Sequence, residues 1–257
     1  GYRTRRNGHN GCLVALQATC CSGERYCLCM RALLGAVRCG PNGLSLSVPR
    51  GRSGGGGQRG EVKGWSRKSC ARHVRWLHSV DGKALDGFGY AVTLTVRDLP
   101  TSEQWGKLRG RWLRCLRDRG VTRVHWVVEW QARGAPHVHA AIYFDAPLTP
   151  PERFEVLDAW VTAARALGTT MAGQDLKPLA GDGLGWAQYQ AKHSARSVHH
   201  YQRGTMPPGW TTTGRLWGHS GDWAVTESRY VLTNQAFYDL RRLVRGYALA
   251  SARSERD

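Results

Sequence analysis

Residues 124–144, VHWVVEWQARGAPHVHAAIYF, contain the pattern that decides the fold. β-Branched and aromatic residues fill both halves of this stretch, and Gly134 and Pro136 lie between the halves. Two such runs on either side of a short loop that contains glycine are typical of an antiparallel hairpin. The sequence therefore predicts strands over 124–131 and 137–144, joined by a loop over 132–136.

Side chains alternate along a strand, so the hairpin has two faces. A symmetric loop centred on Gly134 pairs Gln131 with His137 and also pairs Glu129 with His139. One face then carries Glu129, His137 and His139. The other face is apolar and is expected to be core: Trp126, Val128, Trp130, Val138, Ala140, Ile142 and Phe144. Two imidazoles and a carboxylate that reach one point can hold a divalent ion and leave positions open for substrate.

The metal interpretation of this face has an alternative. A His-x-His pair on a strand also occurs without a metal, and the carboxylate across the hairpin is what favours a ligand set. A register slip of one residue would turn Glu129 to the apolar face. The ligand assignment therefore depends on the pairing of the two strands.

A second group of polar residues lies in a predicted helix over 184–197. Tyr189, Lys192, His193 and Arg196 fall at i, i+3, i+4 and i+7, so they share one stripe of that helix. Taken alone, this stripe is typical of a solvated basic face.

The remaining pattern predicts an α+β domain with an antiparallel sheet. Helices are predicted over 66–79, 102–118 with Ser102 as N-cap, 150–167 and 228–247, strands over 90–96 and 175–179, and a loop with one short strand over 204–223. We assign residues 61–247 to this domain and 248–257 to a C-terminal tail.

The charge of the chain indicates a polyanionic partner. It has 37 Lys and Arg against 19 Asp and Glu, a net charge of +18. No run reaches the roughly 18 apolar residues of a membrane span, so we expect a cytoplasmic protein with reduced thiols and no membrane partner. Residues 1–60 are basic and hold most of the cysteines at irregular spacing. We expect a disordered tail and linker there, with a degenerate zinc knuckle as the alternative.

Three motifs in order carry a resemblance to a known family. They are Thr93-Leu94-Thr95, residues 129–139 (EWQARGAPHVH) and Tyr189-Gln190-Ala191-Lys192. Together they resemble the HUH endonuclease superfamily, and more narrowly the rolling-circle replication initiators (Rep proteins) of bacterial plasmids and phages. Residues 214–218, GRLWG, resemble a segment of actinobacterial plasmid initiators. The resemblance covers about residues 62–245.

The resemblance implies a fold and an activity. The fold would be an RRM-like antiparallel sheet flanked by helices, and the activity would be nicking of one strand at a replication origin. His137 and His139 would bind Mg²⁺ or Mn²⁺ with Glu129 as third ligand. Tyr189 would be the nucleophile that forms a 5′-phosphotyrosine, and Lys192 would position the phosphate or the tyrosine.

The chain departs from the family at one position of the third motif. Many initiators have a second tyrosine one turn after the first, and His193 stands there instead. The resemblance then favours a single nucleophile, with Tyr201 as a fallback candidate. Single-stranded origin DNA would be the partner, followed by host helicase and polymerase.

Several basic and aromatic residues are candidates for DNA contact. Phosphates are expected to contact three parts of the chain. These are the basic helix over 66–79, the hairpin loop and the catalytic segment, which is the predicted helix over 184–197. The residues are Arg72, Arg75, Arg133, His193 and Arg196. His73, Arg67 and Lys68 lie on the same basic helix. Trp210, Trp217 and Trp223 either stack on single-stranded bases or pack the loop that contains them.

Other classes remain as alternatives. A single-tyrosine HUH transposase also places its tyrosine after the histidines, whereas a relaxase usually places it before them. A non-catalytic RRM-like nucleic-acid-binding protein would put aromatic residues on the open face of its sheet, where this sequence puts Glu129 and two histidines. A 2-His-1-carboxylate iron oxygenase would share the ligand set, but neither the charge nor the Tyr-x-x-Lys motif favours it.

Overall fold

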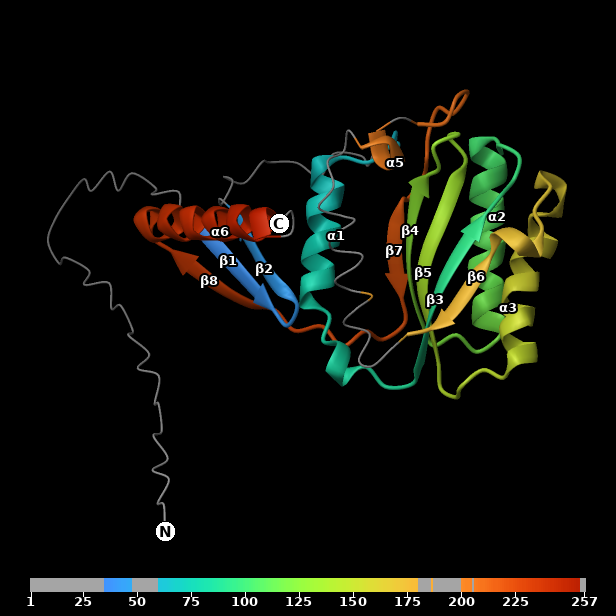
Figure 1. Cartoon of the computed structure of the whole chain (residues 1–257), viewed down its shortest axis with the longest axis horizontal. Helices are drawn as coiled ribbons and strands as arrows, with labels where there is room; N and C mark the ends of the chain where they lie inside the picture. The colour runs from blue at the N-terminus through green and yellow to red at the C-terminus, as the bar shows by residue number, and fades with distance from the viewer. Residues whose placement is uncertain (1–34, 48–59, 180–185, 187–199, 205, 255–257) are drawn as a thin grey trace, which may run out of the picture. The chain divides into compact units, whose positions relative to one another are not determined.

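The computed structural model describes residues 35–47, 60–179, 186, 200–204 and 206–254, all of which belong to one unit, Leu33–Asp257. It is an α+β structure with flanking helices, as the sequence predicts, and it contains two antiparallel sheets (Figure 1). No helix among the described residues is long and apolar enough to cross a bilayer.

The larger sheet contains the predicted hairpin at its centre. Its strand order is β6 (Asp175–Pro178), β3 (Phe88–Thr95), β5 (Pro136–Phe144), β4 (Arg123–Trp130) and β7 (Trp217–Ser220). All four neighbouring pairs are antiparallel. These strands lie close to the predicted ranges, and β7 is the short strand expected within 204–223.

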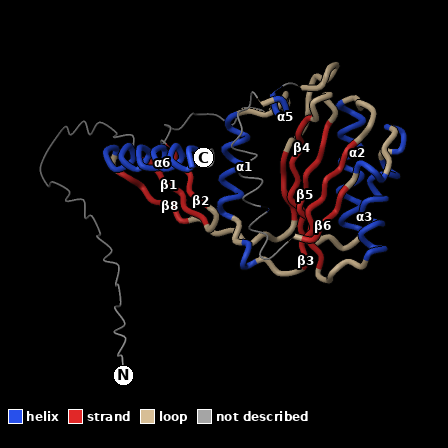
Figure 2. The backbone as a smooth tube through the Cα atoms, viewed as in Figure 1, coloured by secondary structure: helices blue, strands red, loops and turns tan. Residues whose placement is uncertain are grey.

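Helices cover both faces of this sheet (Figure 2). On one face lie α2 (Ser102–Asp118) and α3 (Pro150–Ala163), and on the other lies α1 (Arg67–Ser79). Trp160 of α3 meets Trp105 and Trp112 of α2 edge to face, with ring centroids 5.9 and 6.0 Å apart, in the apolar core. The N-cap of α2 is Thr101 rather than Ser102, because its side chain accepts the Gln104 N–H and completes a capping box.

The position of α1 corrects the expectation that His73 contacts phosphate. Every residue of β4 is buried, on both of its faces. His73 is fully buried and its Nε2 lies 2.9 Å from Nε2 of His125 on β4. It therefore packs against the sheet and cannot contact phosphate, whereas Arg72 and Arg75 on the same helix are exposed.

The hairpin register differs by two residues from the symmetric prediction. Glu129 pairs with His137, and Val127 rather than Glu129 pairs with His139. The chain reverses earlier because Gly134 donates its N–H to the Gln131 carbonyl and takes a left-handed φ of 84°. A shift of two residues preserves the side-chain alternation, so Glu129 remains on the face of the histidines.

The smaller sheet was not predicted. Its order is β2 (Gly43–Ser47), β1 (Gly35–Gly40) and β8 (Ser228–Leu232), and α6 (Asn234–Ser254) follows β8. Part of the expected disordered tail is thus a hairpin, and the first part of the expected helix over 228–247 is a strand. β8 forms because β1, almost 200 positions earlier, pairs with it, which no local periodicity can reveal. The predicted helix over 184–197 lies outside the described residues, apart from Trp186.

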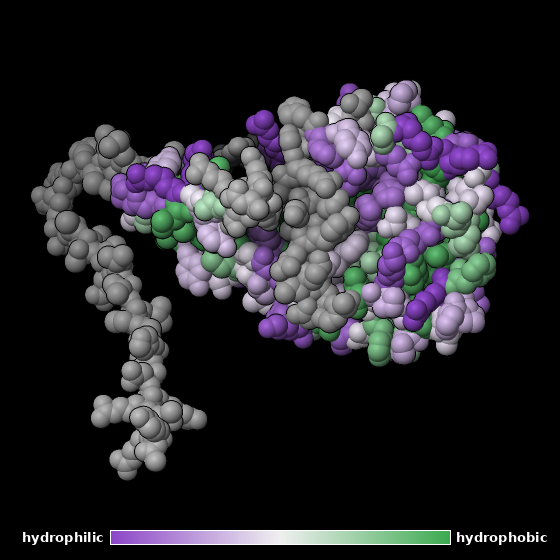
Figure 3. Space-filling model, viewed as in Figure 1, coloured by the Kyte–Doolittle hydropathy of each residue, from purple (hydrophilic) through white to green (hydrophobic). Residues whose placement is uncertain are grey.

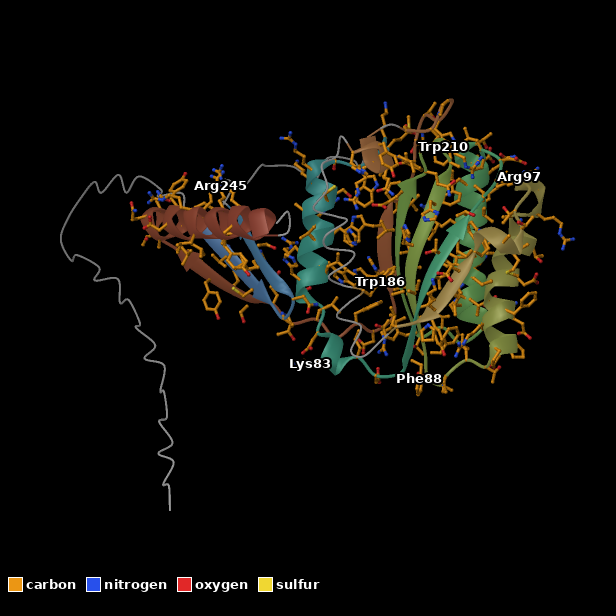
Figure 4. The ribbon with its side chains drawn as sticks, in the orientation of Figure 1. Lys83, Phe88, Arg97, Trp186, Trp210 and Arg245 are labelled. Atoms are coloured by element: carbon orange, nitrogen blue, oxygen red, sulfur yellow. The ribbon has the colours of Figure 1, made fainter. Side chains whose placement is uncertain are left out.

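Short helical and turn segments complete the chain. They are the 3₁₀ turns Gly82–Ala84, Arg165–Leu167 and Met171–Gly173, and the single-turn helix α5, Tyr201–Gly204. Figure 4 shows Trp210 and Arg97 at the end of the larger sheet where β4 and β5 are joined, and Phe88 at the opposite end. His137, at the start of β5, lies at the same end as Arg97.

Candidate active site

The two histidines lie side by side on the central strand β5. The centroids of the His137 and His139 rings are 4.4 Å apart, with 81° between their planes. Thr93 of β3 pairs with His139, and its Oγ1 lies 3.4 Å from His139 Nδ1. Thr95 pairs with His137. The Thr93-Leu94-Thr95 motif therefore lies directly beside the His-x-His motif, as a site built from both requires.

His137 is neutral at neutral pH. Burial is the main factor that lowers the pKa of His137, to about 4, and His139 lowers it further, while Glu129 opposes the shift. The Nδ1 atom of His137 is buried and has no hydrogen-bond partner among the described residues. A neutral imidazole has a lone pair that can bind a metal. His137 is thus in the protonation state that a ligand needs.

Glu129 is held by an arginine that the sequence did not single out. Arg203 of α5 donates from Nε (3.1 Å) and from Nη2 (2.8 Å) to Oε1 of Glu129. Their side chains are 0% and 1% exposed, and the Arg203 guanidinium also stacks over Trp65 at 4.5 Å. A buried carboxylate requires a buried positive partner, but nothing in the sequence indicates which arginine provides it.

The residues present fit a metal ion in part. His137 is neutral and lies beside His139 on one face, as two ligands of one ion must lie. Among the described residues, however, no group of three His, Cys, Asp or Glu side chains is arranged to hold a metal. Glu129 is on the correct face but its Oε1 is engaged by Arg203, so the third ligand is not assembled in this part of the chain.

The other predicted site residues have different positions. Tyr189, Lys192, His193 and Arg196 lie outside the described residues. Tyr201, the fallback nucleophile, is 60% exposed, and its ring centroid lies 4.5 Å from that of His200.

Arg133, predicted to contact DNA, has partners within the protein. Its guanidinium donates to the backbone carbonyls of Val96 and Arg97 and to the side chain of Gln131. These bonds connect the hairpin loop to the end of β3. In this structure Arg133 stabilises the loop that sets the register of β4 and β5.

The three loop tryptophans pack within the protein. Trp210 donates its indole N–H to the Pro100 carbonyl at 2.7 Å, and its ring meets Trp130 edge to face. Trp217 donates to Ser69 Oγ at 3.1 Å, and Trp223 donates to the Ser220 carbonyl at 2.9 Å. These contacts favour the packing role over base stacking for Trp210 and Trp223.

An antiparallel sheet flanked by helices, with a His-x-His motif on its central strand, agrees with the RRM-like HUH fold that the motifs implied. The chain belongs to the ORF2 family of replication-associated proteins, whose model matches residues 89–219, from β3 to β7. The resemblance to replication initiators is thereby confirmed.

Curated relatives agree with this membership. A replication-associated protein of Pseudomonas phage Pf3 is 39% identical over 233 residues, which are 88% of this chain and 81% of that protein. A putative replication protein of Xylella fastidiosa strain 9a5c is 42% identical over 77% of this chain and 73% of its own length. Another putative replication protein, from the Temecula1 strain of the same species, is 40% identical over 77% of this chain and 79% of its own length. No solved structure matches the chain.

Proposed function

We propose that this replication protein is a metal-dependent, tyrosine-type HUH nickase that starts rolling-circle replication by cutting one strand at an origin. The observation that carries the proposal is the pair of adjacent imidazoles, His137 and His139, on the central strand of a replication-associated domain. The burial and low pKa of His137 favour a ligand over a proton-transfer group.

The proposed ligands are His137, His139 and Glu129, and the ion would be Mg²⁺ or Mn²⁺, of which imidazole suits Mn²⁺ better. When bound, the ion would polarise the scissile phosphate and offset the negative charge that develops there. Arg203 donates from Nε and from Nη2 to Oε1 of Glu129, and the proposal assigns the third metal contact to the Glu129 carboxylate. Thr93, beside Nδ1 of His139, would orient that ring as an outer-shell partner.

Tyr189 is the proposed nucleophile. Its phenol oxygen would attack the phosphorus, forming the Oη–P bond as the bond from phosphorus to the 3′ oxygen breaks. The tyrosine proton is lost, and the 3′ oxygen leaves with a proton as a free hydroxyl. A phenol with a pKa near 10 is a weak nucleophile at neutral pH, and the ammonium of Lys192 would favour its phenolate form.

The proposed products define the partners. The phosphotyrosine ester conserves the energy of the broken bond for later rejoining, and the free 3′-OH is a primer. Host polymerase and helicase in the bacterial cytoplasm would act next. We assign DNA contacts in the catalytic segment to His193 and Arg196, whose charge or hydrogen-bonding capacity suits phosphate.

A covalent-adduct assay tests the proposal. Purified protein with Mn²⁺ is incubated with single-stranded oligonucleotides that tile the replicon encoding it, labelled at either end. We expect a denaturation-resistant adduct carrying the 3′-labelled fragment, because the protein remains on the 5′ phosphate. Tyr189→Phe should abolish the adduct, whereas the matched variant Tyr201→Phe should retain it.

Three results would contradict the proposal. An adduct that survives in Tyr189→Phe and disappears in Tyr201→Phe would move the nucleophile to Tyr201. Cleavage that persists in EDTA would remove the metal from the mechanism. A protein that binds these oligonucleotides but never cuts any of them would favour the non-catalytic binding alternative.

A further inference from the structure

A groove of about 930 Å³ lies between α1 and β7, the edge strand of the larger sheet. Its lining includes Arg72, Arg75 and Trp76 from α1, and Arg215, Trp217 and His219 from β7 and the residue pair before it. His137, His139 and Glu129 do not line it. The groove is therefore a feature separate from the candidate active site.

The charged lining of the groove is suited to an anion. Arg72 and Arg75 are three positions apart, on one face of α1, and both are exposed, as is Arg215. Among the described residues, none of these three guanidinium groups forms an ion pair. The two carboxylates of the lining are Glu61 and Glu227.

Glu227 contributes little negative potential, because it is paired with Arg38. The lining therefore carries three guanidinium groups that form no ion pair in the described part of the chain. Only one carboxylate of the lining, that of Glu61, is left to offset their charge. Guanidinium groups bind phosphate through a planar fork of donors, so phosphate is the ligand chemistry that this lining fits.

The groove also offers a flat aromatic surface. His219 is exposed and stacks on Trp76 with 4.3 Å between ring centroids and 7° between the planes. Trp76 in turn packs on buried His125, at 4.7 Å. The rings beneath His219 are thus held in place by the core, and an incoming ring would find a surface that is already ordered.

We propose that this groove binds a segment of single-stranded DNA, with phosphates on Arg72, Arg75 and Arg215 and an unpaired base on His219. Aromatic platforms combined with basic side chains are the usual means of holding a single strand without sequence readout. Duplex DNA would offer the phosphates but no free base face. The identification of the strand as DNA beside a nicking site rests on the proposed function.

The first test measures binding with cleavage disabled. Fluorescence anisotropy with a labelled oligothymidylate is performed in EDTA on the full chain carrying Tyr189→Phe. We expect Arg72→Ala/Arg75→Ala to weaken binding by at least about tenfold. The slope of log affinity against log salt should fall by about 1.4, since each single-strand phosphate contact contributes about 0.7.

The matched control is Arg111→Ala/Arg114→Ala on α2. Both arginines are exposed helix positions on the opposite side of the sheet, so the control removes the same charge with the same change in helix propensity. Figure 3 shows hydrophilic and hydrophobic residues mixed over the side of the molecule where α2 and α3 lie. An equal loss of affinity in both double variants would contradict DNA binding in the groove and indicate a general effect of net charge.

The second test isolates stacking. The wild-type protein is expected to bind oligothymidylate roughly tenfold more tightly than an abasic strand with the same number of phosphates, within the usual range for one stacked base. His219→Ala should remove this preference while keeping the salt slope. If His219→Ala retains the preference, His219 is not the platform.

The outcomes separate this inference from the nickase proposal. Neither measurement needs a metal ion or the tyrosine, so a protein that forms no adduct can still show the predicted binding. The opposite result is also possible. If the adduct depends on Tyr189 but binding is insensitive to substitution of Arg72, Arg75 and His219, the nickase proposal is supported and DNA binding in the groove is contradicted.

Discussion

Nη2 of Arg203 lies 2.8 Å from Oε1 of Glu129, with both side chains excluded from solvent. This pair connects the single-turn helix α5 to β4, across 74 positions of sequence. It also places a positive charge on a carboxylate that the motif alone would assign to a metal. The structural role of this pair and the proposed ligand role of Glu129 can therefore be measured separately.

The first prediction concerns this ion pair. Arg203→Met should lower the free energy of unfolding by about 3–5 kcal/mol, because it leaves a buried carboxylate without its partner. Arg97→Met removes an exposed arginine from its pair with Asp98 and should have a much smaller effect, because solvent screens an exposed ion pair. Urea denaturation measures both. Equal effects of the two substitutions would show that the Glu129 pair has no special structural role.

The second prediction concerns the proposed metal ligands. His137→Ala and His139→Ala should each lower Mn²⁺ affinity, measured by calorimetry, by more than the roughly 10- to 100-fold cost of losing an outer-shell partner. Thr93→Val should fall within that smaller range, since Thr93 would act on the ion through Nδ1 of His139 rather than directly. His78→Ala, on α1, serves as the imidazole control and should leave affinity unchanged. A two-fold effect or less at both His137 and His139 would refute the site.

The third prediction concerns pH. Burial is the largest cause that lowers the pKa of His125, to about 3, and of His137, to about 4, and it also lowers the pKa of His73. Since an unfolded histidine titrates near 6.5, the unfolded chain binds more protons than the folded chain between about pH 4 and 6.5. Stability is then complete above pH 6.5 and falls as pH drops below it.

At pH 5.5 His125 and His137 should each cost about 1.4 kcal/mol, about 3 kcal/mol in total, relative to pH 7.5, and His73 should change stability in the same direction. Urea denaturation at the two pH values measures the difference. The comparison stops at pH 5.5 because the ordinary carboxylates titrate below it. A free energy of unfolding that is the same at both values would contradict the assignment of these histidines as buried and neutral.

The fourth prediction concerns the smaller sheet. A Cβ at Gly35 of β1 would lie 2.1–2.6 Å from atoms of the Phe237 side chain on α6, including its Cβ. Gly35→Ala should therefore destabilise the protein by about 1–3 kcal/mol through overpacking. Gly246→Ala, on the same helix with nothing within 4 Å of the new Cβ, should be neutral or stabilising by up to about 1 kcal/mol. Thermal denaturation compares the two, and a neutral Gly35→Ala would show that β1 and α6 do not pack as described.

The hairpin shows how far local pattern reaches. A side-chain period of two predicted that Glu129, His137 and His139 lie on one face. The structure confirms this shared face, although the predicted register was wrong by two residues. A shift of two leaves the parity unchanged, whereas the turn geometry at Gly134 decided which residues are directly opposed. The motif resemblance then indicated the family, which the comparisons confirm.

The sequence by itself determined the α+β class, the strands of the larger sheet and the helices that flank it. It also determined that the two histidines share a face. These features follow from periodicity within single segments. Tertiary structure alone decided that Arg203 holds Glu129, that α1 covers His125 and that β1 pairs with β8. Each of these contacts joins segments about 50 to 200 positions apart. Such contacts are selected by packing and by the need to neutralise buried charge. A local sequence pattern does not identify the distant residue that will provide the contact.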